Sequence, residues 1–306
     1  MRMSTIPRIV VILPTKNRRP LLERAIESVR AQEGDWRIII VNDGSTDDTR
    51  NFLETVSRDA RVRVITLSSS KGVNAARNAA LHTLSDGEWG FLLDDDDLLL
   101  PGAIEIMQKR IANTPPQLEY IFFNTRIHTP HRTYTGGYQH AEGEEYHDPT
   151  YFEIITKSGL QGDCKPVISA RLMGRGYRFA EDVNGFESEF NALVARDGIG
   201  IRFYRDQVAH IDQAHGLERL SDTAAVRNPN AFVRVHLRMM KDHRELLREH
   251  SALRFARARE GVRVSLRAHD ALAVRRFVLE LMSAWLSVCC DTLFAFFRNE
   301  EDITRK

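Results

Sequence analysis

The sequence predicts an α/β fold with a mainly parallel central sheet flanked by helices, followed by an appended C-terminal helical region. Through the first hundred residues, short apolar runs alternate with segments of helical periodicity, which is typical of successive βαβ units. From about residue 228 the pattern becomes entirely helical. A chain of 306 residues can form a large domain with an appendage, so we expect a main domain over residues 1–222 and a helical region over residues 223–306.

Each predicted strand of the main domain is a short apolar run, and an amphipathic segment follows it. Strands are expected at residues 9–13, 37–41, 62–67, 89–93 and 120–124. Helices are expected at residues 21–32, from a cap at 45–48 to about 56, at 74–84 and from 101 to 113. Residues 128–147, rich in Gly, His and Tyr, predict a hairpin and a loop. No Gly-rich dinucleotide or phosphate loop follows the first strand, which argues against a dehydrogenase or a P-loop enzyme.

Charge and cysteine content limit the classes of partner. The formal net charge of +1 argues against a dedicated nucleic-acid binder. Residues 227–276 nevertheless hold 13 Lys or Arg and 5 Asp or Glu, which favours an anionic surface or an acidic partner for that part. Cys164, Cys289 and Cys290 cannot make a disulfide framework, so a reducing compartment and a cytoplasmic protein are expected. The apolar run at 9–13 is too short for a signal peptide or a membrane span.

The last predicted helix, residues 274–297, has an apolar stripe that includes Phe277, Met282 and Trp285. Its other side carries Glu280 and Asp291, and two carboxylates at membrane depth would be costly, so a spanning helix is not expected. Three placements stay open. The helix packs on the main domain, forms a homodimer, or lies in a membrane interface as a peripheral contact at the inner face.

Four consecutive carboxylates, Asp94 to Asp97, come directly after an apolar strand and just before the Pro101-Gly102 helix start. Adjacent like charges repel, so the cluster loses stability unless a cation or water neutralises it. A hard divalent cation carrying a diphosphate is the expected partner. The alternative is a solvated acidic loop, which is the usual state of a charge run.

Four motifs resemble those of the family 2 glycosyltransferases of GT-A fold, a Rossmann-like arrangement, in their order and spacing. They are VVILPTKNR at 10–18, IVNDGSTDDT at 40–49, GVNAARN at 72–78 and LDDDD at 93–97. The resemblance covers roughly the first 110 residues, with weaker similarity to about residue 215. It implies a nucleotide-sugar-binding half at 1–110, an acceptor-binding half at 111–222, and transfer with inversion from a nucleotide-diphosphate sugar, with a UDP-sugar favoured.

The resemblance also assigns nucleotide-binding residues. Asp43 corresponds to the Asp that contacts the base in the family, and a simple Asx turn with Gly44 is the alternative. The turn after the first strand would face the nucleoside, or would simply end the strand. Lys71 and Arg77 could reach the base or a phosphate, or serve only the surface and the structure. The nucleotide-binding residues expected on these grounds are Pro14, Thr15, Asn17, Asp43, Lys71, Arg77, Asp94 and Asp95.

The metal ligands follow from aligning the acidic run on the family's D-x-D-D form. Asp96 would be the main ligand, Asp94 would contact the ribose or the metal, and Asp95 and Asp97 would support them. Oxygen ligands suit Mn²⁺ or Mg²⁺ without separating the two. Some relatives add a His ligand after the last strand, a weaker expectation for His215, and for His210 weaker still.

The general base is expected at Glu187. The family supplies a Glu-Asp pair at a helix start, about a dozen residues before a Gly that opens a strand, and residues 185–191 and 197–201 have that spacing. Glu187 then stands at the Asp position, while Phe186 stands at the Glu position, a departure from the family. The literal pair Glu181-Asp182 comes earlier, which leaves Asp182 as the alternative base.

We therefore expect a cytoplasmic, metal-dependent glycosyltransferase acting on a saccharide or lipid-linked acceptor in surface polysaccharide or glycolipid assembly, without a nucleic-acid partner. Asp163 and Lys165, in the acceptor half, are further candidates for substrate contact. Two alternatives stay open. One is a degenerate transferase that works as a scaffold, because Phe186 departs from the family. The other is a nucleotidyltransferase, against which the missing Gly-rich loop argues.

Overall fold

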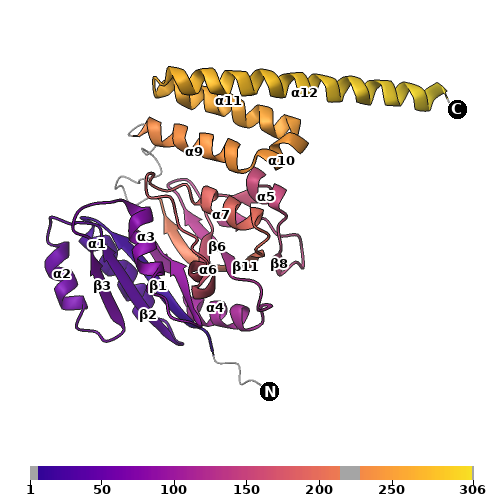
Figure 1. Ribbon diagram of the computed structural model, residues 1–306. Coiled ribbons are helices and arrows are strands. Elements are labelled where there is room, and N and C mark those ends of the chain that lie inside the picture. Colours follow the sequence, from indigo (N-terminus) through magenta and orange to yellow (C-terminus); the bar gives the residue numbers. More distant parts are fainter. Residues whose placement is uncertain (1–5, 214–227, 305–306) are drawn as a thin grey trace. The chain divides into compact units, whose positions relative to one another are not determined.

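The computed structural model describes residues 6–213 and 228–304, with side chains described as far as residue 288. The chain divides into two compact units, residues 1–218 and 219–306 (Figure 1). The expected boundary between residues 222 and 223 lies outside the described residues, as do the side chains of Cys289 and Cys290.

The first unit begins with four parallel strands in the order β3-β2-β1-β4, drawn in indigo and purple in Figure 1. The strands are β1 (Arg8–Thr15), β2 (Trp36–Asn42), β3 (Val62–Thr66) and β4 (Glu88–Leu92), and the helices between them are α1 (Arg19–Arg30), α2 (Thr49–Val56) and α3 (Val73–Leu81). The chain starts at β1, moves outward to β3 and returns to the other side of β1. This reversal creates a switch point at the carboxyl ends of β1 and β4, where open α/β sheets bind ligands.

The remaining strands continue the sheet from β4 in the order β10-β6-β11-β5. Strand β10 runs antiparallel to both of its neighbours, whereas β6 and β11 are parallel to each other. The elements are β5 (Asp97–Leu99), α4 (Ala103–Ala112), β6 (Tyr120–His128), β7 (Thr133–Tyr138), β8 (Tyr146–His147), α5 (Tyr151–Thr156), β9 (Leu160–Gln161), β10 (Lys165–Ser169), α6 (Ala170–Gly174), α7 (Glu187–Arg196) and β11 (Ile201–Asp212). The hairpin expected after residue 128 is confirmed, because β6 and β7 pair antiparallel.

Apolar cores cover both faces of the sheet, which explains why its strands read as continuous apolar runs. In β1, Val11 and Leu13 pack with Ile26 of α1 and Met107 of α4. On the other face, residues of β1 and β2 pack with α3 and α7, including Val10, Ile12, Ile39, Ala80 and Phe190. The α/β class with a central sheet and flanking helices is therefore confirmed, with a parallel first half and a mixed second half.

An ion pair ties β2 to β4 across the intervening β1. Arg37 donates from Nε and Nη2 to the two carboxylate oxygens of Glu88, at 2.8 and 2.7 Å, and Ser85 N donates to Glu88 Oε2 at 2.8 Å. Burial favours the neutral acid, but the hydrogen bonds from Arg37 and Ser85 outweigh it and lower the pKa of Glu88 from its ordinary 4.5. The ionised pair therefore stabilises the fold at neutral pH.

Replacing Glu88 with glutamine is expected to lower the free energy of unfolding at pH 7 by about 3 kcal/mol, because it leaves Arg37 without its buried partner. Since folding lowers the pKa of Glu88, this contribution is present above the unfolded pKa and is lost as pH falls through the folded one. The difference between the two proteins should therefore shrink below about pH 4.5. Urea unfolding followed through Trp36 and Trp89, which lie in β2 and β4, measures it.

The matched control is the exposed pair of Arg8 and Asp35, whose side chains are 50% and 46% exposed. Asp35→Asn should change the free energy of unfolding by less than about 1 kcal/mol. Equal losses for the two variants would contradict the structural role assigned to the pair of Arg37 and Glu88.

The second unit is helical over its described residues. It contains α9 (Pro229–Asp242), α10 (Arg244–Glu249), α11 (Ser251–Arg267) and α12 (Ala271–Thr304). Phe277 of α12 lies against Gly261 of α11, where an added Cβ atom would come within 2.3 Å of the ring. The single apolar stripe expected on α12 is wrong in part, since Phe277 is buried whereas Met282 and Trp285 are exposed. None of the helices in the described residues combines the length and apolar character needed to span a membrane.

Candidate active site

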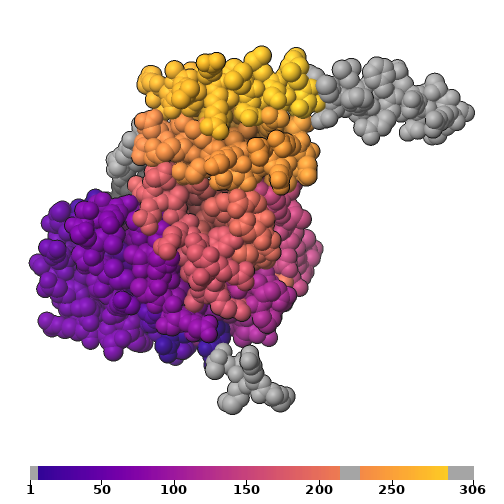
Figure 2. All heavy atoms as spheres, viewed as in Figure 1, coloured from indigo at the N-terminus to yellow at the C-terminus, as the bar shows by residue number. Residues whose placement is uncertain are grey.

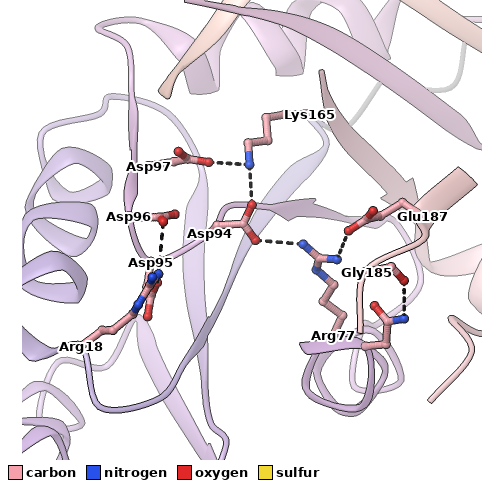
Figure 3. Close-up of polar contacts among 10 residues, drawn as sticks. Arg18, Arg77, Asp94, Asp95, Asp96, Asp97, Lys165, Gly185 and Glu187 are labelled. Atoms are coloured by element: carbon pink, nitrogen blue, oxygen red, sulfur yellow. Dashed lines mark hydrogen bonds and ion pairs between the residues drawn. The ribbon is translucent and has the colours of Figure 1, made fainter. Parts of the chain in front are cut away.

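The acidic run lies at the carboxyl end of β4, beside the end of β1 (Figure 3). Asp94, Asp95 and Asp96 occupy the turn between β4 and β5, and Asp97 is the first residue of β5. The residues Asp95, Asp96 and Asp97 are only 5%, 8% and 1% exposed, and Asp94 is half-buried. A solvated acidic loop, the alternative left open by the sequence, is therefore wrong.

Arg18, the residue before α1, neutralises one side of the run. Its Nη1 donates to Asp95 Oδ1 at 3.0 Å and to Asp96 Oδ2 at 3.1 Å. The Thr15 hydroxyl, at the end of β1, donates to Asp95 Oδ2 at 2.7 Å. Thr15, expected to face the nucleoside, thus also holds Asp95 in place.

Lys165, the first residue of β10, neutralises the other side. Its Nζ lies 2.7 Å from Asp94 Oδ2 and 2.5 Å from Asp97 Oδ2, and its side chain is only 7% exposed. Burial disfavours the ammonium, but the two carboxylates outweigh that effect and raise the pKa of Lys165 above its ordinary value. The lysine therefore stays charged inside the site.

Arg77, from α3, joins the acidic run to the candidate base. Its Nη2 donates to Asp94 Oδ1 at 2.8 Å, and its Nη1 donates to Glu187 Oε1. The result is a continuous chain of ion pairs through Lys165, Asp94, Arg77 and Glu187, in which the two cations alternate with carboxylates (Figure 3). The guanidinium of Arg77 thereby positions both Asp94, the expected contact to the nucleotide or the metal, and Glu187, the expected base.

The carboxylates of the site differ in acidity. Burial opposes ionisation of Asp94, but Lys165 and Arg77 outweigh it and hold its pKa well below the usual range. Burial is the largest influence on Asp95 and Asp97, and raises their pKa values to about 6 and about 7. Burial also opposes ionisation of Glu187, yet the charge of Arg77 lowers its pKa. Glu187 is therefore an ionised carboxylate at neutral pH, as a general base must be.

Glu187 lies at the start of α7, the position expected for the base, and follows Phe186, whose backbone is left-handed at φ 62°. Asp182 lies in an exposed turn five residues earlier. Of the two candidate bases, the structure connects Glu187 to the acidic run through Arg77. This connection favours Glu187.

A divalent cation fits the chemistry of the site in two respects. Within the described residues, the acidic run and Glu187 supply five carboxylates, and three cationic side chains pair with them. The donors are hard oxygens, which Mg²⁺ and Mn²⁺ prefer. No group of three or more potential ligands forms within the described part of the chain.

The structure describes one of the two histidines that were considered as metal ligands, His210, but not the other, His215. His215 lies outside the described residues. His210 belongs to β11, and its ring stacks near that of His128 with the ring centroids 6.3 Å apart. In the ladder between β11 and β5, His210 is the register partner of Leu98, the residue after Asp97 of the acidic run.

Asp43, which follows β2, organises the loop at residues 70–72. Its Oδ1 accepts a hydrogen bond from Lys71 N at 2.6 Å, and its Oδ2 accepts from Gly72 N at 3.0 Å and from the Ser70 hydroxyl at 2.8 Å. Asp43 therefore contacts this distant loop, which a local Asx turn with Gly44 would not require. Because a carboxylate has about four acceptor positions, a donor on a base could still approach it.

The first turn ends beside the same loop. Asn17 has a left-handed backbone with φ 55°, and its Oδ1 accepts a hydrogen bond of 2.8 Å from Thr46 N. Lys16 Nζ donates a hydrogen bond of 2.9 Å to the Ser70 hydroxyl. Pro14 pairs with Val41 of β2. The residues expected at the nucleoside end thus gather at the carboxyl ends of β1 and β2, although Asn17 is engaged in joining two turns.

Two amides of α3 hold the segment that leads to Glu187. Asn74 Nδ2 donates to the carbonyls of Ala180, Val183 and Gly185 at 2.8 to 3.1 Å. Asn78 donates to Phe179 O at 2.9 Å and accepts from Phe179 N at 3.0 Å. Asn78 therefore has a structural role, because it fixes the backbone at Phe179. Neither asparagine is among the predicted site residues, although their spacing of four residues places both on one face of a helix.

The sequence matches a protein-family model, Glycosyl transferase family 2, over residues 10–168. A GalNAc(5)-diNAcBac-PP-undecaprenol beta-1,3-glucosyltransferase of Campylobacter jejuni is 41% identical over 107 residues, which cover 34% of each chain. The chain thus spans about a third of the length of this curated relative.

Two solved structures share the fold. Residues 1–349 of S. aureus TarS in complex with UDP-GlcNAc superpose with a TM-score of 0.59 at 16% identity, covering 91% of this chain and 89% of the other. The mannosyltransferase PcManGT from Pyrobaculum calidifontis, in complex with GDP-Man and Mn²⁺, gives a TM-score of 0.56 at 16% identity, with coverage of 95% and 81%. Because the family model matches more than half of the chain, this protein belongs to glycosyl transferase family 2, and its fold is GT-A.

Proposed function

We propose that this chain transfers a sugar, with inversion, from a nucleotide-diphosphate sugar to an acceptor hydroxyl. The observation that carries the proposal is the bridge that Arg77 makes between Asp94 and Glu187. It places an ionised carboxylate beside an acidic run at the edge of the sheet where α/β folds bind nucleotides. A general base and a leaving-group site are the two parts that such a transfer requires.

In the proposed reaction, Glu187 takes the proton of the acceptor hydroxyl. The hydroxyl oxygen forms a bond to the anomeric carbon, while the bond from that carbon to the diphosphate oxygen breaks on the opposite face. Configuration at the anomeric carbon therefore inverts. Arg77 fixes the direction of the Glu187 carboxylate, and the low pKa of Glu187 keeps it ionised before the acceptor arrives.

We propose that Asp96 and Asp94 hold Mn²⁺ or Mg²⁺ together with diphosphate oxygens. Bound there, the ion would neutralise charge on the departing diphosphate, which stabilises the transition state by several kcal/mol. The hard carboxylate oxygens that the acidic run gathers at this edge of the sheet support a dication. Thr15 and Arg18 would support the ion indirectly, because both hold Asp95 and Arg18 also holds Asp96.

We propose a UDP-sugar as donor and a saccharide or lipid-linked acceptor, in surface polysaccharide or glycolipid assembly. The solved structure of TarS with UDP-GlcNAc supports the donor class. The undecaprenol-linked substrate named for the Campylobacter jejuni relative supports the acceptor class. Asp43 and the backbone around residues 70–72 would receive the base, since they lie together at the end of β2.

Calorimetry with UDP tests the donor site. UDP is expected to bind the protein with Mn²⁺ present and at least about 100-fold more weakly after Asp96→Ala, because the metal then loses its main ligand. Asp86→Ala, which removes an exposed carboxylate elsewhere in the same unit, is the control and should leave binding unchanged. Equal UDP affinity with and without Mn²⁺ would contradict the proposed metal.

A release assay for the sugar from a panel of UDP-sugars completes the test. Turnover of at least one donor is expected from the ionised Glu187 carboxylate. Binding without turnover of any donor would favour the alternative, a degenerate transferase acting as a scaffold, to which the Phe186 departure points.

A further inference from the structure

The second unit exposes large apolar side chains along one side of α12. Opposite them, Ala273, Phe277 and Ala284 are buried. The exposed positions 272, 279 and 286 are seven residues apart, so they form one stripe along the helix. The side chains concerned, each more than half exposed, are Leu272, Leu279, Met282, Trp285 and Leu286. Figure 2 shows the described part of α12 as the yellow edge of this unit.

The charges along the same side of the helix are positive. Arg275 and Arg276 are exposed there, and neither forms an ion pair with a described carboxylate. The nearby acidic groups are used elsewhere. Glu280 accepts a hydrogen bond of 2.6 Å from Arg254 Nη2 of α11. Asp270 caps α12, because its carboxylate accepts a hydrogen bond of 2.9 Å from Ala273 N. Arg275, Arg276 and the five apolar residues form what we call the α12 face.

The α12 face continues onto the end of α11. Leu266 of α11 is 59% exposed. It lines a hollow of about 470 Å³ together with Val274, Arg275, Val278 and Leu279 of α12. Apolar and cationic side chains of two helices thus meet in one surface.

We propose that the α12 face binds an anionic lipid surface. The leucines would enter the boundary between headgroups and acyl chains, Arg275 and Arg276 would contact lipid phosphates, and Trp285 would lie at the level of the headgroups. Charge complementarity supports this occupant, because the α12 face carries two cations that pair with no described carboxylate, and an anionic bilayer offers many phosphates. The helix would lie in the plane of the interface.

A second copy of the chain fits the same surface less well. Symmetric pairing through the α12 face would bury Arg275 and Arg276 of both copies in a mainly apolar contact. The described side chains of the face include no carboxylate to separate them, since Glu280 is paired with Arg254. Desolvating like charges costs free energy, whereas lipid phosphates remove that cost.

Co-sedimentation of the full-length protein with vesicles tests the proposal. We expect the protein to bind vesicles of phosphatidylcholine that contain about one third phosphatidylglycerol. Binding to phosphatidylcholine alone should be weaker, and binding to the anionic vesicles should fall as the salt concentration rises. Arg275→Gln/Arg276→Gln should weaken binding about 30-fold, and Leu279→Ser/Leu286→Ser at least about 100-fold. Trp36 and Trp89 are buried, so a blue shift of tryptophan emission on binding would report Trp285.

The matched control for net charge is Arg50→Gln/Arg58→Gln, which removes two exposed arginines from the first unit and should bind vesicles like the unmodified protein. Equal losses for both arginine pairs, or no binding to anionic vesicles at low salt, would overturn the proposal. Light scattering measures whether the protein is a monomer or a dimer. A dimer that Leu279→Ser/Leu286→Ser converts to a monomer would assign the α12 face to self-association instead. None of these readouts depends on the proposed sugar transfer.

Discussion

Replacing Glu187 with glutamine is expected to lower the turnover number of sugar transfer about 1,000-fold. Glutamine has the same size, and its Oε1 can still accept the hydrogen bond from Arg77, but it cannot take a proton from the acceptor. The affinity for UDP with Mn²⁺ should change by less than about threefold, because Asp94 retains both Arg77 and Lys165. Steady-state kinetics and calorimetry on the same preparation measure the two quantities.

The control for this substitution is Asp182→Asn, which alters the other candidate base. Asp182 lies in an exposed turn, so its loss should leave turnover within about twofold. Near-normal transfer by Glu187→Gln would remove Glu187 from the reaction. If Asp182→Asn were the inactive variant, the base would have to be assigned to Asp182.

Replacing Lys165 with methionine is expected to lower turnover about 100-fold and to tighten the binding of Mn²⁺ measured without nucleotide. The affinity for Mn²⁺ should rise because the substitution removes a positive charge that lies beside Asp94 and repels the ion. Turnover should fall because Asp94 loses one of the two cations that orient it. A merely structural lysine would not produce opposite changes in these two quantities.

Folding must be separated from function in this case. Removing Lys165 leaves Asp97 buried without its partner, which should cost about 3 kcal/mol of stability. The double variant Lys165→Met/Asp97→Asn removes that unpaired charge and should recover much of the melting temperature, but not the turnover. Native turnover in the single variant would show that Arg77 alone is enough to orient Asp94.

The elements of the first half could be predicted because both faces of its strands are covered. Complete burial of Val10, Val11, Ile12 and Leu13 leaves a continuous apolar run in the sequence, which is visible without knowledge of the partners. The predicted ends of the helices and strands were less accurate. The helix expected from residue 21 begins at Arg19, because Pro20 is well suited to the first turn of a helix.

The second half depended on contacts that no local pattern contains. The strand expected at residues 120–124 extends to His128, because β7 and β11 provide hydrogen-bonding partners for the additional residues. Strand β10 inserts antiparallel between β4 and β6, far from either in sequence. Periodicity describes the faces of an element but not the neighbours that pair with its edges.

The charge balance of the site was predicted only in part. Repulsion among four adjacent carboxylates correctly indicated that cations must be present, and the sequence argument assigned that task to a metal. The structure shows that Arg18, Arg77 and Lys165 perform much of it. Arg18 and Lys165 had no local signal of this role, because each contacts carboxylates more than 65 positions away.

The position of Lys165 also determines how far the chain can be shortened. The ammonium that compensates Asp94 and Asp97 comes from β10, beyond the first 110 residues that carry the recognisable motifs. A fragment ending there would expose the edge of β4 and leave Asp97 without its counterion. The first 110 residues are therefore not expected to form a working site by themselves, and any shortened catalytic version of this protein has to retain β10.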